Sequence, residues 1–187
     1  NLYNLDIARK FSNKINHVYL VEGYMDVIGL SNNGIENVVA NLGTSLTDRQ
    51  ILMLNQFFDD VIICFDGDES GYKAALRAAE NSIKELQPEK NISFLFLPNS
   101  EDPDSFTNKN GMEYFINYSK KSKISIHQFI FEHYSKEAND SPSSMAIFEK
   151  KLREVSNTIK DKFIKKYVLE YFLEKISSLT PHTNNNK

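Results

Sequence analysis

Near its middle, the chain contains the run Val61-Ile62-Ile63-Cys64-Phe65-Asp66-Gly67-Asp68. The first five residues are apolar and include several β-branched side chains, which predicts a buried strand. This strand would end where two carboxylates, separated by one glycine, begin. A long helix is expected over residues 69–86, because a stripe of alanines there would let a helix pack closely against a sheet and Pro88 would end it.

Strand and helix signals alternate on both sides of this run. Further strands are predicted at residues 17–22, 37–40 and 92–97, and helices at residues 24–30 and 47–57. The second of these helices would begin with a capping box formed by Thr47 and Gln50. Because the connections are short, the sequence predicts an α/β fold with a mostly parallel, four-stranded sheet flanked by helices.

Strand signals fade after residue 111. Helices are expected at about residues 124–138, 142–160 and 162–178, the second with Ser141 as its cap and Pro142 at its first helical position. We therefore expect two units, an α/β core at residues 1–110 and a C-terminal helical bundle at residues 111–187.

The composition is that of an ordinary globular protein. Of 187 residues, 41% are hydrophobic and 25% are charged, and 13 Phe and 9 Tyr supply a core, which excludes collagen, a disordered tail and a disulfide scaffold. The one cysteine, Cys64, cannot form an internal disulfide and is expected to be inert core. Neither an export signal nor an apolar run of about 20 residues is seen. We expect a cytoplasmic protein without a membrane partner.

The net charge of −3 conceals an uneven distribution. Residues 1–110 carry 9 Lys and Arg against 16 Asp and Glu, whereas residues 111–187 carry 13 against 9. The basic segments 120–123, 150–153 and 160–166 would either guide a nucleic-acid backbone or form the solvent side of helices. The periodicity favours the second interpretation, in which the inner faces carry Ile126, Phe129, Ile130, Phe163, Tyr167 and Phe172.

Six acidic residues fall at or just beyond the ends of predicted strands: Glu22, Asp26, Asp66, Asp68, Asp102 and Asp104. The carboxyl ends of parallel strands meet at one edge of a sheet, so Glu22, Asp66 and Asp104 are expected to converge. Carboxylates without nearby His or Cys favour Mg²⁺ or Mn²⁺, bound as two ions or as one ion with a second shell. Alternatively, Asp66 or Asp104 would cap a helix. Three acidic clusters after three successive strands favour the metal site.

Four motifs together resemble the TOPRIM core of bacterial DnaG-type DNA primases. They are Val21-Glu22-Gly23-Tyr24-Met25-Asp26-Val27, Leu42-Gly43-Thr44-Ser45, Phe65-Asp66-Gly67-Asp68 with Gly71, and Glu101-Asp102-Pro103-Asp104. The glutamate and Asp-x-Asp motifs alone would indicate only the TOPRIM module, which topoisomerases, small nucleases and recombination proteins also contain. The stretch Glu-Gly-Tyr-Met-Asp-Val, combined with Leu-Gly-Thr-Ser, is narrower and indicates a primase.

This resemblance implies part of a DNA primase, a nucleotidyltransferase that joins ribonucleoside triphosphates on a single-stranded DNA template into RNA primers for replication. Glu22, Asp66 and Asp68 would be the central, catalytic metal ligands for Mg²⁺ or Mn²⁺, with Asp26, Asp102 and Asp104 completing the site, and Glu22 would be a candidate general base. The family's zinc ribbon, polymerase subdomain and helicase-binding domain are not recognisable here. Zinc and the replicative helicase would therefore bind elsewhere in a longer protein, and this fragment alone would be weakly active or inactive.

Five further residues are candidate nucleotide or nucleic-acid contacts: Gly43, Thr44, Ser45, Lys73 and Arg77. The backbone amides of Gly43-Thr44-Ser45, which follow a predicted strand, would cradle a phosphate. Lys73 and Arg77 lie one helical turn apart and would face a phosphate, although a solvated helix face is the simpler interpretation.

Two other classes of function remain open. A TOPRIM nuclease would use the same acidic site and water to break phosphodiester bonds, whereas a topoisomerase would need a nucleophilic tyrosine on a separate domain. A non-catalytic interaction module would use the acidic cluster for folding and the basic helices for partner binding. Ribonucleotide incorporation, strand cleavage, or neither would separate the three classes.

Overall fold

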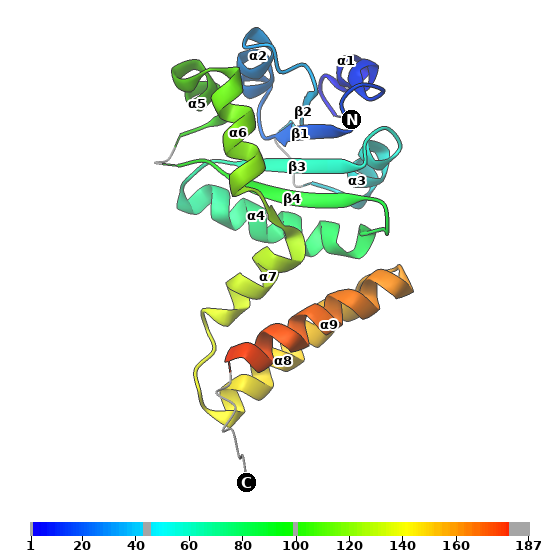
Figure 1. The fold of residues 1–187 in the computed structure, drawn as a ribbon, viewed down its shortest axis with the longest axis vertical. Helices are drawn as coiled ribbons and strands as arrows, with labels where there is room; N and C mark the ends of the chain where they lie inside the picture. Colours follow the sequence, from blue (N-terminus) through cyan, green and yellow to red (C-terminus); the bar gives the residue numbers. More distant parts are fainter. Residues whose placement is uncertain (1, 43–45, 99–100, 180–187) are drawn as a thin grey trace.

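A five-stranded sheet forms the centre of the computed structural model, which describes residues 2–42, 46–98 and 101–179 (Figure 1). The strand order is β2-β1-β3-β4-β5. The strands are β1 (His17–Val21), β2 (Val38–Ala40), β3 (Asp60–Phe65), β4 (Asn91–Phe96) and β5 (Ile124–Ser125). The first four are parallel, as predicted, and β5 pairs antiparallel with β4.

The four-stranded prediction is therefore short by one strand. β5 lies where the sequence predicted the start of a helix, and that helix begins two residues later. Two residues are too few to produce the alternating pattern by which a strand is recognised, so only pairing with β4 defines this one.

Nine α-helices and two short 3-10 helices make up the rest of the regular structure in the described residues. They are α1 (Leu5–Ala8), η1 (Arg9–Phe11), α2 (Tyr24–Asn32), α3 (Asp48–Asn55), α4 (Glu69–Ser82), η2 (Ile83–Glu85), α5 (Pro103–Asn110), α6 (Met112–Ser122), α7 (Ile126–Ser135), α8 (Pro142–Asn157) and α9 (Lys162–Leu179). The predicted caps are present, because Thr47 and Gln50 form a capping box and the Ser141 side chain accepts from the Ser144 amide. The sequence missed α5 and α6.

The two faces of the sheet carry separate apolar clusters. On one face, Tyr19, Ile62 and Leu95 pack with α2, α5 and α6, where Phe106 and Phe115 are buried. The neighbouring residues of the same strands point to the opposite face, which is covered by α3, α4 and α7 (Figure 1). This alternation follows from the two-residue period of a strand.

The second apolar cluster continues from the sheet into α8 and α9, which pair with each other beyond α7 (Figure 1). Phe148 and Leu152 of α8 and Phe172 of α9 are buried in it. The division at residue 110 stays a prediction about folding units. The elements that directly follow this position, α6 and β5, pack on the sheet.

Two aromatic residues of α9 lie on the opposite side from the one predicted. Phe172 is buried, but Phe163 and Tyr167 are 60% and 61% exposed. The buried line of α9 instead runs through Val168, Phe172 and Ile176. Apolar residues surround much of this helix in sequence, so its periodicity alone does not determine which side packs against α8. The inner-face prediction for Phe163 and Tyr167 is therefore wrong.

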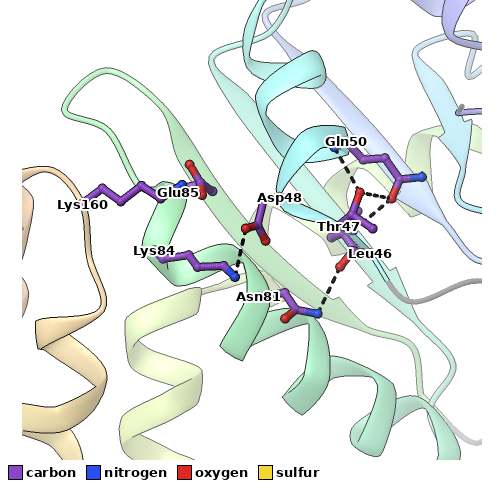
Figure 2. A network of polar contacts seen from close by, with 8 residues as sticks. All are labelled: Leu46, Thr47, Asp48, Gln50, Asn81, Lys84, Glu85 and Lys160. Carbon is purple, nitrogen blue, oxygen red and sulfur yellow. Dashed lines mark hydrogen bonds and ion pairs between the residues drawn. The ribbon is translucent and has the colours of Figure 1, made fainter.

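A chain of polar contacts joins the α8–α9 connection to the start of α3 (Figure 2). Lys160 forms an ion pair with Glu85 in η2, and the Glu85 side chain is almost completely buried. Its neighbour Lys84 contacts Asp48 at 3.0 Å, in the first turn of α3. One turn earlier on α4, the Asn81 side-chain amide donates to the Leu46 carbonyl at 3.2 Å. These contacts hold the segment that leads into α3 against the helices below it.

No helix in the described part of the chain has the length and apolar character needed to cross a membrane.

Candidate active site at the carboxyl edge of the sheet

The two central strands each end in a carboxylate. β1 and β3 are adjacent and parallel, and their register pairs Leu20 with Ile63. Extending this register by two residues places Glu22 opposite Phe65, so Asp66 lies one residue further along the same edge. The parallel pairing that the strand sequences dictate therefore brings two distant carboxylates to one place.

Loops that follow β1 and β4 bring further carboxylates to this edge. Asp26 stands in the first turn of α2, where its Oδ2 accepts from the Gly23 amide at 3.1 Å. Asp102 directly precedes α5, and the Gly67 amide after β3 donates to the Glu101 carbonyl at 3.4 Å. This last contact ties the loop after β3 to the loop after β4.

Four carboxylates line one cavity of about 680 Å³: Glu22, Asp26, Asp66 and Asp102. Its floor is formed by apolar residues of β1 and β3 and by α4. Asp68 and Asp104 are not among the lining residues. Of the three carboxylates predicted to converge, Glu22 and Asp66 share the cavity. Asp104 lies instead beside Asp26, against α2.

Negative charge is in excess at the cavity, because four carboxylates line it. Burial raises the pKa of Asp66 to about 6, and the negative charges of Glu22, Asp26, Asp102 and Asp68 act in the same direction. The pKa of Asp26 is also raised, first by burial and then by Asp102 and Asp104, against the amide hydrogen bond from Gly23. Ionised carboxylates at this edge are therefore held at an energetic cost that a cation would relieve.

Glycine at two positions makes the close packing of the site possible. A Cβ on Gly71 would lie 2.2 Å from the Asp66 carbonyl oxygen, which is backbone and cannot turn away. A Cβ on Gly29 in α2 would lie 1.9 Å from Asp104 Oδ1. The first glycine lets α4 begin directly beneath the Asp66 loop, and the second lets α5 lie against α2.

Two of the six carboxylates also cap helices, and they are not the two expected. Asp68 Oδ1 accepts from the Gly71 amide at 2.7 Å at the start of α4. Asp102 Oδ1 accepts from the Ser105 amide at 2.7 Å at the start of α5. A carboxylate offers about four acceptor positions, so a cap leaves room for a second partner. The predicted caps Asp66 and Asp104 are therefore replaced by Asp68 and Asp102.

The donor set fits a hard divalent cation. The carboxylates at the edge supply oxygen ligands only. Among the described residues that line the cavity, the other metal-binding type is represented by Cys64, which is buried and whose thiol pKa is raised by burial. Within the described ranges, no group of three or more His, Cys, Asp or Glu side chains is arranged to hold an ion. Mg²⁺ commonly takes only one or two protein carboxylates and completes its shell with water and substrate oxygens.

The other candidate residues have different positions. Arg77 lines the cavity from α4, whereas Lys73, one turn earlier, is exposed and pairs with Glu69 at 2.6 Å. Gly43, Thr44 and Ser45 lie outside the described residues. The sequence reasoning missed Asn41, a buried side chain of the cavity wall whose Oδ1 accepts from Gln50 at 2.6 Å. Its position at the end of a predicted strand was the available signal.

Comparison with known proteins places the chain, rather than its individual site residues, in a family. Residues 16–96 match the Toprim domain. The DNA primase of Rickettsia felis is 38% identical over 176 residues, which are 94% of this chain and 29% of that protein. The DNA primase of Pseudomonas putida is 39% identical over 138 residues, which are 74% of this chain and 21% of that protein. The chain thus spans less than a third of these curated relatives.

Solved structures of primases share the fold. A DNA primase domain from Pseudomonas aeruginosa superposes with a TM-score of 0.89 and 32% identity, over 96% of this chain and 56% of that one. The DnaG primase catalytic domain bound to ssDNA has a TM-score of 0.86 and 30% identity, over 93% of this chain and 56% of that one. By sequence and by fold, the chain carries a Toprim domain and belongs with the catalytic core of DnaG-type DNA primases.

Proposed function

We propose that this chain forms the catalytic core of a DNA primase and takes part in metal-dependent synthesis of RNA primers on a single-stranded DNA template. The observation that carries the proposal is the gathering of Glu22, Asp26, Asp66 and Asp102 around one cavity at the carboxyl edge of a Toprim sheet. The curated relatives are named DNA primases, and one related structure is described as bound to ssDNA. Both support this function over a nuclease or a non-catalytic module.

In this proposal, Glu22, Asp66 and Asp68 hold Mg²⁺ or Mn²⁺, and Asp26, Asp102 and Asp104 complete the acidic site. A divalent cation supplies charge neutralisation for the phosphate under attack and for the departing pyrophosphate. The chain's own residues orient the ligands: the cap on α4 fixes Asp68, the turn hydrogen bond from Gly23 fixes Asp26, and the cap on α5 fixes Asp102. Glu22 is exposed at the end of β1 and is the candidate acceptor for the proton of an attacking hydroxyl.

Arg77 is the proposed phosphate contact of the cavity, since it shares the lining with the carboxylates. Lys73 is a weaker candidate because its charge is matched by Glu69. Ribonucleoside triphosphates are the proposed substrates. Zinc and a replicative helicase, if they act with this protein, are assigned to other parts of a longer primase.

The first test is a titration of Mg²⁺ and Mn²⁺ followed by heat of binding and by melting temperature. Asp66→Asn removes one ligand and, unlike a change at Asp68, leaves the α4 cap in place. Because Asp66 is held in a site that raises its pKa to about 6, the variant should melt higher than the wild type without metal at pH 8. After allowance for solvent screening of a half-buried group, about 1 kcal/mol is expected, or about 2–4 °C for a chain of this size.

Metal should raise the melting temperature of the wild type and leave that of Asp66→Asn almost unchanged. Glu89→Gln, which removes an exposed carboxylate in the turn before β4, is the matched control and should respond to metal like the wild type. Identical responses of wild type and Asp66→Asn would overturn the metal site. Once the site is established, activity is measured on the longer protein with and without the same change. A primase incorporates ribonucleotides, whereas a nuclease cleaves strands instead.

A further inference from the structure

The exposed side of the first two turns of α9 combines two aromatic rings with lysines. Phe163 and Tyr167 are four residues apart, so their side chains lie one above the other along the helix. The Lys162 ammonium lies 5.3 Å from the centre of the Phe163 ring, and the Lys166 ammonium lies 5.2 Å from the centre of the Tyr167 ring. We call these four residues the α9 platform.

Packing within the chain does not account for this arrangement. The opposite side of α9 is buried through Val168, Phe172 and Ile176, and it already anchors the helix. Two large aromatic side chains of which about 60% remains exposed contribute little further burial. Exposed apolar side chains that adjoin one another form a contiguous patch, and such patches, unlike single exposed residues, mark binding surfaces.

The charge around the platform selects a polyanion. Residues 160–167 contain four lysines and one aspartate, Asp161. Asp161 Oδ1 is engaged as the helix cap, where it accepts from the Phe163 and Ile164 amides at 2.9 Å. In the described part of the chain Lys162 and Lys165 form no ion pair, and Lys166 approaches Glu170 at 3.8 Å, a weak contact between exposed groups. Glu170 marks the end of the basic surface along the helix.

We propose that the α9 platform binds single-stranded nucleic acid, with unpaired bases stacked on Phe163 and Tyr167 and phosphates contacted by the lysines. Exposed rings beside lysines are the arrangement that binds single strands without reading their sequence, because every base has a face on which to stack. In a duplex the bases are already stacked on one another, so the rings would have no partner there. The apolar area is also too small for an amphipathic membrane helix, whose whole apolar side must be free.

The platform lies at the opposite end of the sheet from the acidic edge. Ile164 lines a small pocket with Asp60 and Asn91, the first residues of β3 and β4, whereas the carboxylates follow the last residues of these strands. A strand of six residues spans roughly 20 Å. The platform is therefore a contact separate from the acidic edge, and it does not depend on metal.

The chain contains no tryptophan, which allows a direct test. Tyr167→Trp places a single fluorescent indole on the platform, and a base stacked on it should quench its emission. Ile7→Trp on α1, which lies on the other side of the sheet from α9 in Figure 1, is the matched reporter and should respond much less. The probes are oligo-dT and oligo-rU of about twenty nucleotides, so that DNA and RNA are compared. They are titrated at low salt in the presence of EDTA, which removes any contribution of metal bound at the acidic edge.

The expected result is that either single strand quenches the indole of the Tyr167→Trp variant. This binding should weaken about tenfold or more with Phe163→Ser and with the Lys162→Gln, Lys166→Gln pair. Affinity should also fall as salt rises. A duplex of equal length that binds as well as the single strands would overturn the stacking proposal. So would quenching equal to that of the Ile7→Trp reporter, binding to anionic vesicles in place of oligonucleotides, or burial of the platform indole by dimerisation. Circular dichroism of each variant verifies that these surface changes leave the fold intact.

Discussion

Gly71 has a larger role at the residue scale than its size suggests. Its amide donates to Asp68 Oδ1, and the position that its Cβ would occupy is 2.2 Å from the Asp66 carbonyl oxygen. Gly71 therefore binds the side chain of Asp68 and leaves space for the backbone of Asp66 in the loop after β3. The same loop explains why Asp66 and Asp68 have different roles: one faces the cavity and the other caps α4.

Gly71→Ala tests this role. The added methyl group would push the first turn of α4 away from the Asp66 loop, which should destabilise the protein by about 2 kcal/mol, as overpacking of a closed site does. It should also weaken the metal-induced rise in melting temperature. Ser70→Ala, an exposed position in the same turn, should change neither quantity appreciably. Thermal melts with and without Mg²⁺ measure both effects, and a fully stable Gly71→Ala variant with a wild-type metal response would contradict this interpretation.

At the scale of elements, the short β5 strand and α7 form the connection between the sheet and the C-terminal helices. His127 in the first turn of α7 packs edge-on against Tyr171 of α9, with ring centres 4.7 Å apart. Its Nε2 is 3.0 Å from the Ser125 hydroxyl. Burial lowers the pKa of His127 below its usual value of 6.5. The neutral imidazole is therefore part of the packed connection between α7 and α9.

A pH dependence follows from this burial. In the unfolded chain His127 binds a proton near pH 6.5, whereas in the folded protein it does so only at lower pH. The contribution of His127 to the free energy of unfolding is therefore fully present above pH 6.5 and falls as the pH is lowered through that value. Burial also lowers the pKa of His17, which adds to the fall in the same direction. His127→Gln should reduce the decrease in melting temperature between about pH 7 and pH 5. An unchanged slope in this variant would mean that other groups control acid stability.

At the scale of the whole molecule, the polar chain in Figure 2 connects the C-terminal helices to the region beside the cavity. Glu85 retains only 3% of its side-chain exposure, and its partner Lys160 comes from the α8–α9 connection. The Lys160 amide also donates to the Lys84 carbonyl at 3.1 Å. The connection between the two C-terminal helices therefore supplies the positive charge that neutralises the buried carboxylate of Glu85.

Removal of Lys160 should destabilise the whole chain, because a buried carboxylate without its partner is costly. Lys160→Met should lower the melting temperature by several degrees, whereas Arg153→Met, which breaks the exposed pair with Glu149, should change it little. The double variant Lys160→Met, Glu85→Gln should recover much of the loss, because the buried charge is then gone. Equal effects of Lys160→Met and Arg153→Met would show that the Glu85 pair does not hold the two parts together.

Local sequence determined much of this protein. Strand composition predicted the four parallel strands, because β-branched and apolar runs are visible within five or six residues. Capping boxes depend on residues three apart, so the start of α3 was also predictable. The six carboxylates were identified by their place after strands, since parallel strands end at one edge. The motifs around these carboxylates also resemble the TOPRIM core, and residues 16–96 match the Toprim domain.

The tertiary structure alone decided which side chains do what at that edge. Asp66 faces the cavity, Asp68 caps α4, and Asp102 both lines the cavity and caps α5, because the direction of each side chain depends on packing between loops far apart in sequence. The same holds for β5, which exists only through its pairing with β4. The exposure of Phe163 and Tyr167 was likewise settled by the packing of α9 through its other side. Periodicity describes one segment at a time, whereas burial depends on which segments meet.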